Sequence, residues 1–379
     1  MKKLKGYVIM KNLGFGFMRL PLLNKEDAKS VDIKQVEQMV DAFLEQGFTY
    51  FDTAYMYHSY TSEIVLRETL VKRHDRSKFT VASKLPVMFL KKEEDNEKIF
   101  NEQLTKCGVD YFDYYLLHSL DTDNYANAMR LNSFEFVSRM KAAGKVKKMG
   151  FSFHGSPELL DEILTNHPEV EFVQLQLNYI DWEHKGIRSR ECYEVARKHN
   201  KPIIVMEPVK GGTLVNIPEK AQETFRNIHP DMSVASWAIR YAASREGVFM
   251  VLSGMSDMSQ LQDNMSYMQD FRPLSEEEEA AVASVVKIIN DSVTIPCTSC
   301  GYCVDGCPKK IAIPQYFALF NAQKQEIKKP FTVQQGYYET LCETHGKASD
   351  CIACKKCESV CPQHLKIAKL LKEVSYMFE

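Results

Sequence analysis

The chain lacks the features that would place it at once in several large classes of protein. No apolar run approaches the roughly 18–20 residues that a membrane-spanning helix requires, so no integral membrane protein is predicted. The formal net charge is only −2, which gives no electrostatic reason to expect binding to nucleic acid or to an anionic membrane. Hydrophobic and charged residues make up 45% and 26% of the chain, the proportions of a soluble globular protein with a buried core.

Cysteine is also scarce along most of the chain. Of the eleven cysteines, Cys107 and Cys192 are isolated and the other nine lie close to the C-terminus. A chain of 379 residues does not need disulfides to stabilise its core, so this clustering favours metal ligation in a reducing compartment. The N-terminus is basic but its apolar stretch is interrupted, which predicts a mature start and not a signal peptide. We therefore expect a cytoplasmic protein.

Up to about residue 270 the sequence alternates short β-rich runs with longer stretches of helical periodicity. Candidate strands cover residues 13–18, 49–54, 79–84, 112–118, 147–152, 172–178, 202–208 and 249–254. Between them apolar residues recur at helical spacing, as in 36–47, and Ser156 followed by Pro157 is typical of a helix start. Eight β-then-α units match a closed parallel barrel better than an open sheet. We therefore predict an α/β fold, a (β/α)8 or TIM barrel, over residues 1–290.

Several predicted strands are apolar until their last residues, which are polar. These residues are Asp52, Lys84, His118, Ser152, Asn178, Glu207 and Ser253. In a parallel barrel the carboxyl ends of the strands meet at one mouth, where active sites lie. A single polar residue at such a place fits equally well a strand that ends in solvent. The succession Asp, Lys and His on three neighbouring strands instead favours a catalytic site.

After about residue 291 the β/α rhythm stops and a cysteine motif occurs twice. Residues 297–308 (CTSCGYCVDGCP) and 351–362 (CIACKKCESVCP) share the spacing C-x2-C-x2-C-x3-C-P. This spacing is typical of [4Fe–4S] ligation in which the fourth cysteine serves the other cluster. Zinc, the alternative, does not explain the third cysteine or the proline. The predicted ligand sets are Cys297, Cys300, Cys303 with Cys361, and Cys351, Cys354, Cys357 with Cys307.

The 43 residues between Cys307 and Cys351 (308–350) are too many for a compact bacterial ferredoxin. Residues 313–323 and 365–378 have helical periodicity, and Cys342 lies outside the motifs, as a spare thiol would. The segment 291–379 resembles the helical two-cluster ferredoxin domains in the iron–sulfur subunits of succinate dehydrogenase and fumarate reductase. The resemblance implies a small, mainly helical ferredoxin-like domain with two [4Fe–4S] clusters.

The segment FDTAYMYHS at 51–59, with Lys84 and His118 ending the next two strands, resembles the aldo-keto reductase family. The resemblance extends over roughly residues 5–270 and implies a catalytic tetrad of Asp52, Tyr57, Lys84 and His118. These residue types suit reduction of a carbonyl by hydride. Tyr57 would protonate the developing alkoxide, and Lys84 would lower the pKa of Tyr57 towards the working range. Asp52 would hold Lys84 charged, and His118 would orient the carbonyl.

The same resemblance implies a nicotinamide cofactor at the barrel mouth. The matching residues are Ser152 and Gln174 for the carboxamide, Met206 for the face of the nicotinamide, Lys210 and Gly211 for the pyrophosphate, and Ser253, Gly254, Met255, Gln260, Asp263 and Asn264 for the adenine end. Gln260 stands where an arginine often binds the 2′-phosphate of NADP. Gly254 and Met255 stand where lysine and serine are common. Because a phosphate favours Arg or Lys partners, both NADP and NAD stay candidates.

The combination of hydride chemistry and clusters leaves three hypotheses. A cluster takes one electron at a time whereas a hydride carries two, so exchange between them usually needs a flavin. In the first hypothesis the barrel reduces a small carbonyl compound, or oxidises an alcohol, with NAD(P)H, and the clusters transfer electrons or are structural. In the second it is a flavin- or ferredoxin-linked reductase, fed by a ferredoxin- or flavodoxin-like carrier. In the third it is a non-catalytic electron-transfer module. The complete tetrad argues against the third hypothesis, and of the other two the sequence favours the first.

Overall fold

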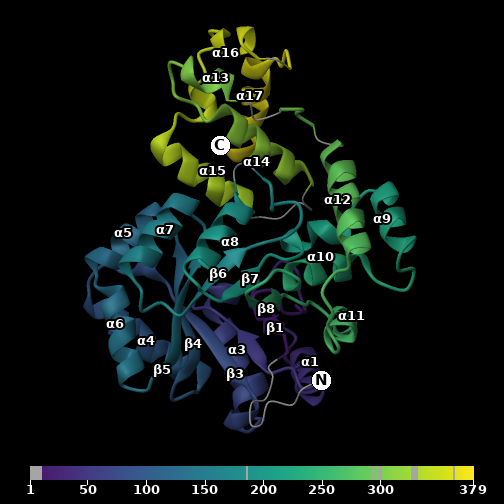
Figure 1. Cartoon of the computed structure of the whole chain (residues 1–379). Coiled ribbons are helices and arrows are strands. Elements are labelled where there is room, and N and C mark those ends of the chain that lie inside the picture. Colours follow the sequence, from purple (N-terminus) through teal and green to yellow (C-terminus); the bar gives the residue numbers. More distant parts are fainter. Residues whose placement is uncertain (1–10, 185–186, 292–293, 298–300, 326–331, 362) are drawn as a thin grey trace.

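The computed structural model describes residues 11–184, 187–291, 294–297, 301–325, 332–361 and 363–379 (Figure 1). The predicted mature start at residues 1–10 and the predicted ligand Cys300 lie outside these ranges. Within them, eight parallel strands pair in chain order and the last pairs with the first, which closes a barrel. The strands are β1 (Leu13–Gly16), β2 (Tyr50–Asp52), β3 (Thr80–Leu85), β4 (Phe112–Leu120), β5 (Val146–Phe153), β6 (Phe172–Gln176), β7 (Ile203–Met206) and β8 (Val248–Ser253). The predicted (β/α)8 barrel is confirmed.

Helices surround the barrel and pack against its strands or against one another. They are α1 (Ile33–Glu45), α2 (Tyr57–Tyr60), α3 (Ser62–Leu66), α4 (Glu94–Cys107), α5 (Thr122–Arg130), α6 (Ser133–Ala142), α7 (Pro157–Asn166), α8 (Ser189–Lys198), α9 (Glu219–Arg226), α10 (Val234–Ala243), α11 (Met258–Met268) and α12 (Glu276–Asp291). Helix α7 starts as its sequence predicts, because the Ser156 side chain accepts a hydrogen bond from the Leu159 amide and Pro157 occupies the first turn.

The barrel interior is filled by side chains and is therefore a packed core with its polar groups at one end. Apolar residues from six of the eight strands form this inner cluster: Tyr50, Ala82, Leu116, Phe172, Ile204, Met250 and Leu252. Gly150 makes the packing possible, because a Cβ atom there would lie 2.5 Å from the carbonyl oxygen of Phe172. A larger apolar core lies between the strands and the outer helices.

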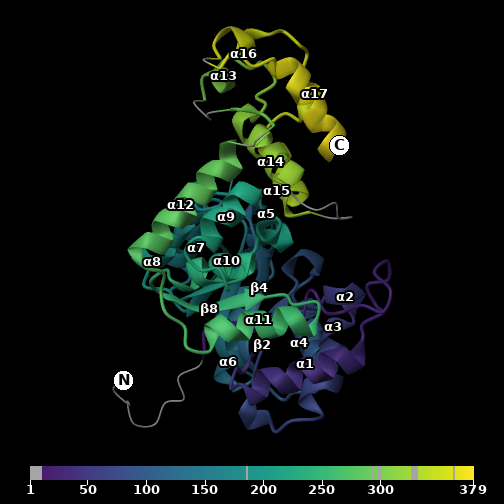
Figure 2. The same cartoon turned by 90° about the vertical axis from the view of Figure 1, so that its right-hand side faces the viewer.

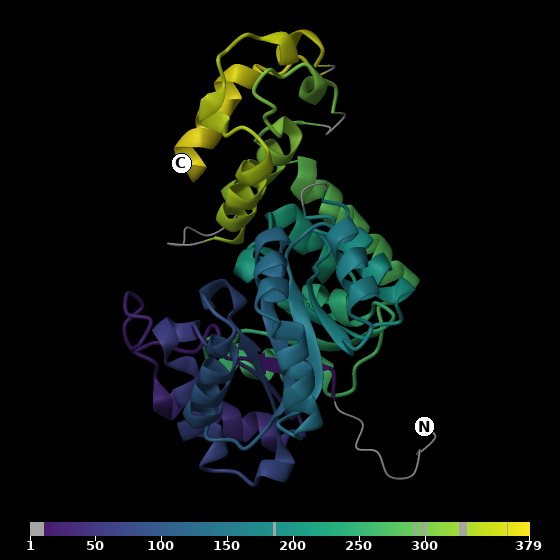
Figure 3. The same cartoon turned by 90° about the vertical axis from the view of Figure 1, so that its left-hand side faces the viewer.

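The C-terminal region is helical and has a core of its own. Its helices are α13 (Tyr302–Asp305), α14 (Ile313–Gln325), α15 (Val333–Thr344), α16 (Lys356–Ser359) and α17 (Ile367–Phe378). Their core is a separate cluster that includes Tyr316, Phe320, Tyr338 and Leu371. Figures 1, 2 and 3 agree that α14 and α15 face the barrel, whereas α13 and α16 lie at the far end. None of the helices in the described part of the chain has the length and apolar character needed to cross a bilayer.

Candidate functional site

The centre of the site is a buried ion pair between neighbouring strands. Asp52 ends β2 and Lys84 lies near the end of β3, and the Nζ atom of Lys84 is 2.5 Å from Oδ1 of Asp52. Lys84 also donates a hydrogen bond of 2.9 Å to the carbonyl oxygen of Thr53. Burial by itself lowers the pKa of Lys84, but the charge of Asp52 and its hydrogen bond help to raise this pKa above its ordinary value. Lys84 is therefore a fixed cation at the barrel mouth.

Tyr57 and His118 lie over this ion pair, so the structure brings the four predicted residues together. The Nζ atom of Lys84 is 5.0 Å from the centroid of the Tyr57 ring. The rings of Tyr57 and His118 meet edge-on, with centroids 6.0 Å apart. Burial, together with the nearby positive charge of Lys84, holds the pKa of His118 well below its usual range. His118 is therefore a neutral imidazole at pH 7.

The pKa of Tyr57 corrects one expectation from the sequence. Lys84 lowers this pKa, as expected, but burial of the phenol raises it by more. The net pKa therefore lies above the ordinary value of 10.0, and not below it. Tyr57 consequently stays protonated across the neutral range.

The turn that presents Tyr57 contains a residue that sequence reasoning missed. His58, Ser59 and Tyr60 have φ angles of 48°, 50° and 72°, in the left-handed region that side chains rarely adopt. His58 holds this turn, because its Nε2 accepts from the Leu20 amide at 3.2 Å and its Nδ1 lies 2.9 Å from the Ala28 carbonyl oxygen. His58 stands beside Tyr57 in the sequence, but only its contacts show that it is an anchor.

Three buried polar atoms on β2, β4 and β6 have no hydrogen-bond partner within the described ranges. They are Oδ2 of Asp52, Nδ1 of His118 and Oε1 of Gln174. Buried polar groups are normally paired, so unpaired ones at a barrel mouth fit a site that completes itself with a ligand. The Oγ atom of Ser152 accepts from the Ser119 amide at 2.7 Å and keeps its own proton to donate. An amide such as the carboxamide of nicotinamide has the matching donor and acceptor for Gln174 and Ser152.

The residues predicted for the adenine end lie together at β8 and α11. Ser253 ends β8 and accepts a hydrogen bond from Nδ2 of Asn264 at 2.8 Å. Asp263 accepts from Ser233 at 2.6 Å. The Gln260 side chain is engaged locally, because its Oε1 accepts from the Ser256 amide and its Nε2 donates to Asp257, both at 2.9 Å. At the position where an arginine often binds a 2′-phosphate, the structure therefore has a neutral Gln260 side chain held by Ser256 and Asp257.

Two cations at the mouth have partners that the sequence does not reveal. Lys210, predicted near the pyrophosphate, is buried in an ion pair of 2.6 Å with Asp181. Arg19, three residues beyond β1, forms an ion pair of 3.3 Å with Glu207. A Cβ atom at Gly254 would lie 3.0 Å from the Arg19 side chain, so Arg19 covers this glycine. Arg19 is thus the cation next to the predicted adenine end, and nothing in the motif pattern distinguishes it.

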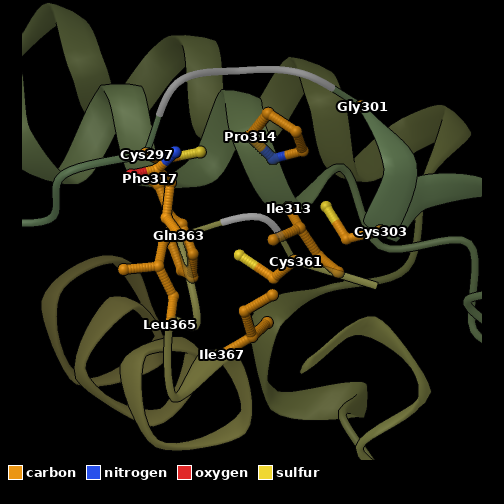
Figure 4. A pocket seen from close by; sticks show the side chains of 10 residues that line it. All are labelled: Cys297, Gly301, Cys303, Ile313, Pro314, Phe317, Cys361, Gln363, Leu365 and Ile367. Carbon is orange, nitrogen blue, oxygen red and sulfur yellow. The ribbon is translucent and has the colours of Figure 1, made fainter. Parts of the chain in front are cut away.

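The C-terminal region contains two pockets that divide the cysteines as the sequence predicts. One is lined by Cys297, Cys303 and Cys361, whose sulfur atoms surround the same cavity in Figure 4. The other is lined by Cys307, Cys351, Cys354 and Cys357. In each pocket one thiol thus comes from the other motif. Converging thiols of this kind are the donor set of an iron–sulfur cluster.

The C-terminal region contacts the barrel at its mouth. Tyr337 of α15 places its hydroxyl 3.3 Å from Nδ1 of His154, which follows β5, and donates to Oε1 of Gln176 at 3.4 Å. A second contact joins the backbone of Ala318 in α14 to the His184 ring. These contacts fix the helical region over the ends of β5 and β6.

Comparisons with known proteins agree with both parts of this description. Residues 12–287 match the aldo/keto reductase family, and residues 296–366 match the 4Fe-4S dicluster domain. A curated relative, the uncharacterized oxidoreductase YqkF of Bacillus subtilis (strain 168), is 23% identical over 280 residues, which cover 66% of this chain and 87% of that protein.

Solved aldo-keto reductase structures share the barrel. The holo form of AKR11C1 from Bacillus halodurans has a TM-score of 0.59 at 22% identity and covers 72% of this chain and 91% of its own. An aldo-keto reductase from Klebsiella pneumoniae in complex with NADPH has a TM-score of 0.58 at 17% identity, covering 73% of this chain and 91% of its own.

Proposed function

Because the chain belongs to the aldo/keto reductase family, we propose that this oxidoreductase reduces a small carbonyl compound with NAD(P)H, or oxidises the corresponding alcohol. The observation that carries the proposal is the buried Lys84–Asp52 ion pair, with Tyr57 and His118 over it. Asp52, Lys84 and His118 lie towards the ends of β2, β3 and β4, and Tyr57 lies in the turn that follows β2. In this fold, catalysis takes place at this end of the barrel.

Each of the four residues has a role that its environment supports. Tyr57 is the proton donor to the developing alkoxide, because burial raises its pKa and keeps the phenol protonated. Lys84 stabilises the phenolate that remains, and Asp52 holds Lys84 in place. His118, which is neutral, orients the carbonyl oxygen by a hydrogen bond and does not compete as an acid.

The cofactor of the proposal is NADP or NAD. When bound, the nicotinamide supplies the hydride. Ser152 and Gln174 offer a donor and an unpaired acceptor to its carboxamide, and Ser253 and Asn264 form the surface at the adenine end. The NADPH complex of the Klebsiella pneumoniae protein supports NADP. Gln260 is uncharged and is hydrogen-bonded to Ser256, which supports a weaker preference for NADP over NAD than an arginine would give. Arg19 is the cation that lies near this position.

We also propose that the C-terminal region holds two [4Fe–4S] clusters. Cys297, Cys300, Cys303 and Cys361 would hold one, and Cys351, Cys354, Cys357 and Cys307 the other. Bound clusters would supply one-electron transfer. Helices α13 and α16, which carry the motifs, lie away from the barrel in all three views, where a ferredoxin- or flavodoxin-like carrier has access (Figure 3). Because such clusters need reduced thiols, we place the protein in the cytoplasm.

The proposal is tested with the full chain purified anaerobically. The wild type should oxidise NADPH or NADH in the presence of small aldehydes and ketones, and Tyr57→Phe should lower kcat by at least about a hundredfold, the usual contribution of general acid catalysis. Nicotinamide binding, followed by cofactor fluorescence, should survive the substitution. Turnover that requires added FMN would instead support the flavin-linked reductase. Full activity of Tyr57→Phe would refute the assigned role.

A further inference from the structure

A chain of hydrogen bonds runs beside the tetrad and joins the barrel to helix α15. Nζ of Lys210 lies 2.6 Å from Oδ1 of Asp181, and Nε2 of Gln176 donates to the other carboxylate oxygen of Asp181 at 2.9 Å. The hydroxyl of Tyr337 donates to Oε1 of Gln176 at 3.4 Å and lies 3.3 Å from Nδ1 of His154. The chain thus begins at a buried charge pair and ends at an imidazole.

The charge pair sets the direction of every hydrogen bond in this chain. Lys210 lowers the pKa of Asp181 even though burial acts in the opposite sense, so Asp181 is a carboxylate that can only accept. Gln176 must therefore turn its NH2 group to Asp181 and its oxygen to Tyr337. The hydroxyl has one proton, which it gives to Gln176, and it accepts from the Nδ1–H of His154. His154 is then the tautomer whose Nε2 has a free lone pair.

The last two groups of this hydrogen-bond chain, Tyr337 and His154, are uncharged at neutral pH. Burial lowers the pKa of His154 to about 4. Burial likewise raises the pKa of the Tyr337 phenol well above its ordinary value. The end of the chain is therefore a neutral hydrogen-bond acceptor, which suits a neutral donor group of a ligand and not an anion.

His154 directly follows β5, beside the strand that carries His118. Its backbone amide donates a hydrogen bond of 2.9 Å to the carbonyl oxygen of Leu120, two residues beyond His118. His118 and His154 therefore lie at the same end of the barrel, on β4 and directly after β5, and these two strands pair with each other. Nδ1 of His154 is engaged by Tyr337, whereas its Nε2 makes no hydrogen bond to any residue that the structure describes.

We infer that His154, oriented by Tyr337 of the C-terminal region, is a substrate-binding residue, and that the substrate is a hydroxyketone or hydroxyaldehyde and not a keto acid. A hydroxyl next to the carbonyl would donate to the lone pair on Nε2 of His154. The carboxylate of a keto acid has no proton to donate. Its oxygen lone pairs would face the lone pair on Nε2 of His154, and the two would repel each other. The inference rests on the proposed carbonyl reduction, of which it names the substrate class. Tyr337 is a positioning residue in this arrangement, because it acts through His154.

Three carbonyl compounds of similar size test the inference on the full chain with its clusters. Hydroxyacetone carries the hydroxyl, 2-butanone replaces it with a methyl group, and pyruvate carries a carboxylate. We expect the wild type to favour hydroxyacetone over 2-butanone by at least about tenfold in kcat/KM, mostly through KM, and to reduce pyruvate poorly. Tyr337→Phe and His154→Phe should both lower this ratio about tenfold, and comparing ratios removes the intrinsic reactivity of each ketone.

Matched controls separate this role from a merely structural one. Tyr376→Phe makes the same change at a tyrosine of the C-terminal region that is 91% exposed, and should leave the ratio and the iron content as in the wild type. In ¹⁵N NMR spectra His154 should be protonated on Nδ1 in the wild type and should lose this tautomer preference in Tyr337→Phe. A wild type that prefers pyruvate, or an unchanged ratio in Tyr337→Phe, would overturn the inference.

Failure of the proposed function would be seen separately. A wild type that reduces none of the three compounds with either nicotinamide disproves carbonyl reduction of this class. The His154 spectrum then decides the inference alone, because hydroxyacetone should shift the Nε2 resonance and 2-butanone should not. Absence of that shift would also count against the inference.

Discussion

The Nζ atom of Lys84 lies 2.5 Å from Oδ1 of Asp52, and neither side chain is more than 4% exposed. Because both ions are buried and have lost their hydration, the pair is stable only if each ion has well-placed hydrogen-bond partners in the protein. Lys84 has a second acceptor in the Thr53 carbonyl oxygen, 2.9 Å away. The pair therefore holds the Lys84 cation beneath Tyr57. The free energy lost when the two ions leave water is offset by the ion pair and by the hydrogen bond to Thr53.

Removing the negative partner should destabilise the fold. Asp52→Asn leaves the buried Lys84 cation without a counter-charge, and we expect a loss of about 3–5 kcal/mol in the free energy of unfolding. Urea denaturation followed by circular dichroism measures this loss. Lys287→Gln, which breaks an exposed ion pair with Asp291, is the matched control and should hardly change the midpoint. Equal effects of the two substitutions would contradict the assignment of a buried, paired cation.

The pH dependence of carbonyl reduction should be flat around neutrality. Tyr57 must be protonated to act as the acid, and its pKa lies above the ordinary value of 10.0, so the rate should fall only as the pH rises through that alkaline value. His118 has a pKa well below 6.5 and stays neutral to markedly acidic pH, so it adds no loss of activity between pH 6 and 7. The profile of kcat/KM against pH, taken at constant ionic strength, tests both statements.

The same profile distinguishes the role of Lys84. Lys84→Met removes the charge that lowers the pKa of Tyr57, so the alkaline limb should move to higher pH while kcat falls. If the alkaline limb of Lys84→Met moved to lower pH, the group that titrates there would not be Tyr57. Lys72→Met, on an exposed lysine that pairs with Glu68, should leave the profile unchanged.

Glu63 lies behind the tetrad and should make stability depend on pH. Its carboxyl accepts hydrogen bonds from Ser83 at 2.8 Å and from Gln103 at 2.6 Å, and burial raises its pKa from 4.5 to about 7. The folded protein therefore binds this proton more tightly than the unfolded chain. The stabilisation is complete below pH 4.5 and is lost as the pH rises through 7, by roughly 3 kcal/mol in total at 1.36 kcal/mol per pKa unit.

The variant Glu63→Gln isolates this contribution. It keeps the shape of the side chain but cannot ionise, so its unfolding free energy should change less between pH 5 and pH 8 than that of the wild type. Guanidinium denaturation at both pH values provides the comparison. Parallel slopes in the two proteins would assign the pH dependence to other carboxylates.

The contact between α15 and the barrel includes like charges. Glu343 lies near Asp121 and Asp123, and burial followed by these two charges raises its pKa. A carboxyl with a raised pKa destabilises the folded contact when it is ionised, so the contact should tighten as the pH falls. Glu343→Gln should strengthen it at pH 8 by on the order of 0.5 kcal/mol. Slower amide hydrogen exchange in α15 would report this, with Glu339→Gln on the same helix as the control.

The sequence predicts the barrel well because each strand is buried on both faces and each helix has one apolar face. The tetrad follows from residue types at the ends of consecutive strands, and the division of the cysteines follows from their spacing. The contacts of Tyr337 with His154 and Gln176 join residues 183 and 161 positions apart. No local pattern encodes such distances, and the same is true of the pair between Arg19 and Glu207. The residue boundary between the two regions, placed at 290 and 291, stays a prediction.

The exchange of the fourth cysteine between the two motifs predicts a specific pattern of iron loss. The wild type should hold about eight irons per chain, as two four-iron clusters require, and Cys361→Ser should retain about four. Cys361 lines the pocket of Cys297 and Cys303, so adding Cys297→Ser should remove no further iron, whereas adding Cys351→Ser should remove nearly all of it. Cys342→Ser, whose thiol contacts the Tyr316 hydroxyl at 3.3 Å, should keep the full content. The opposite result for the two double variants would mean that each motif binds its cluster with its own four cysteines.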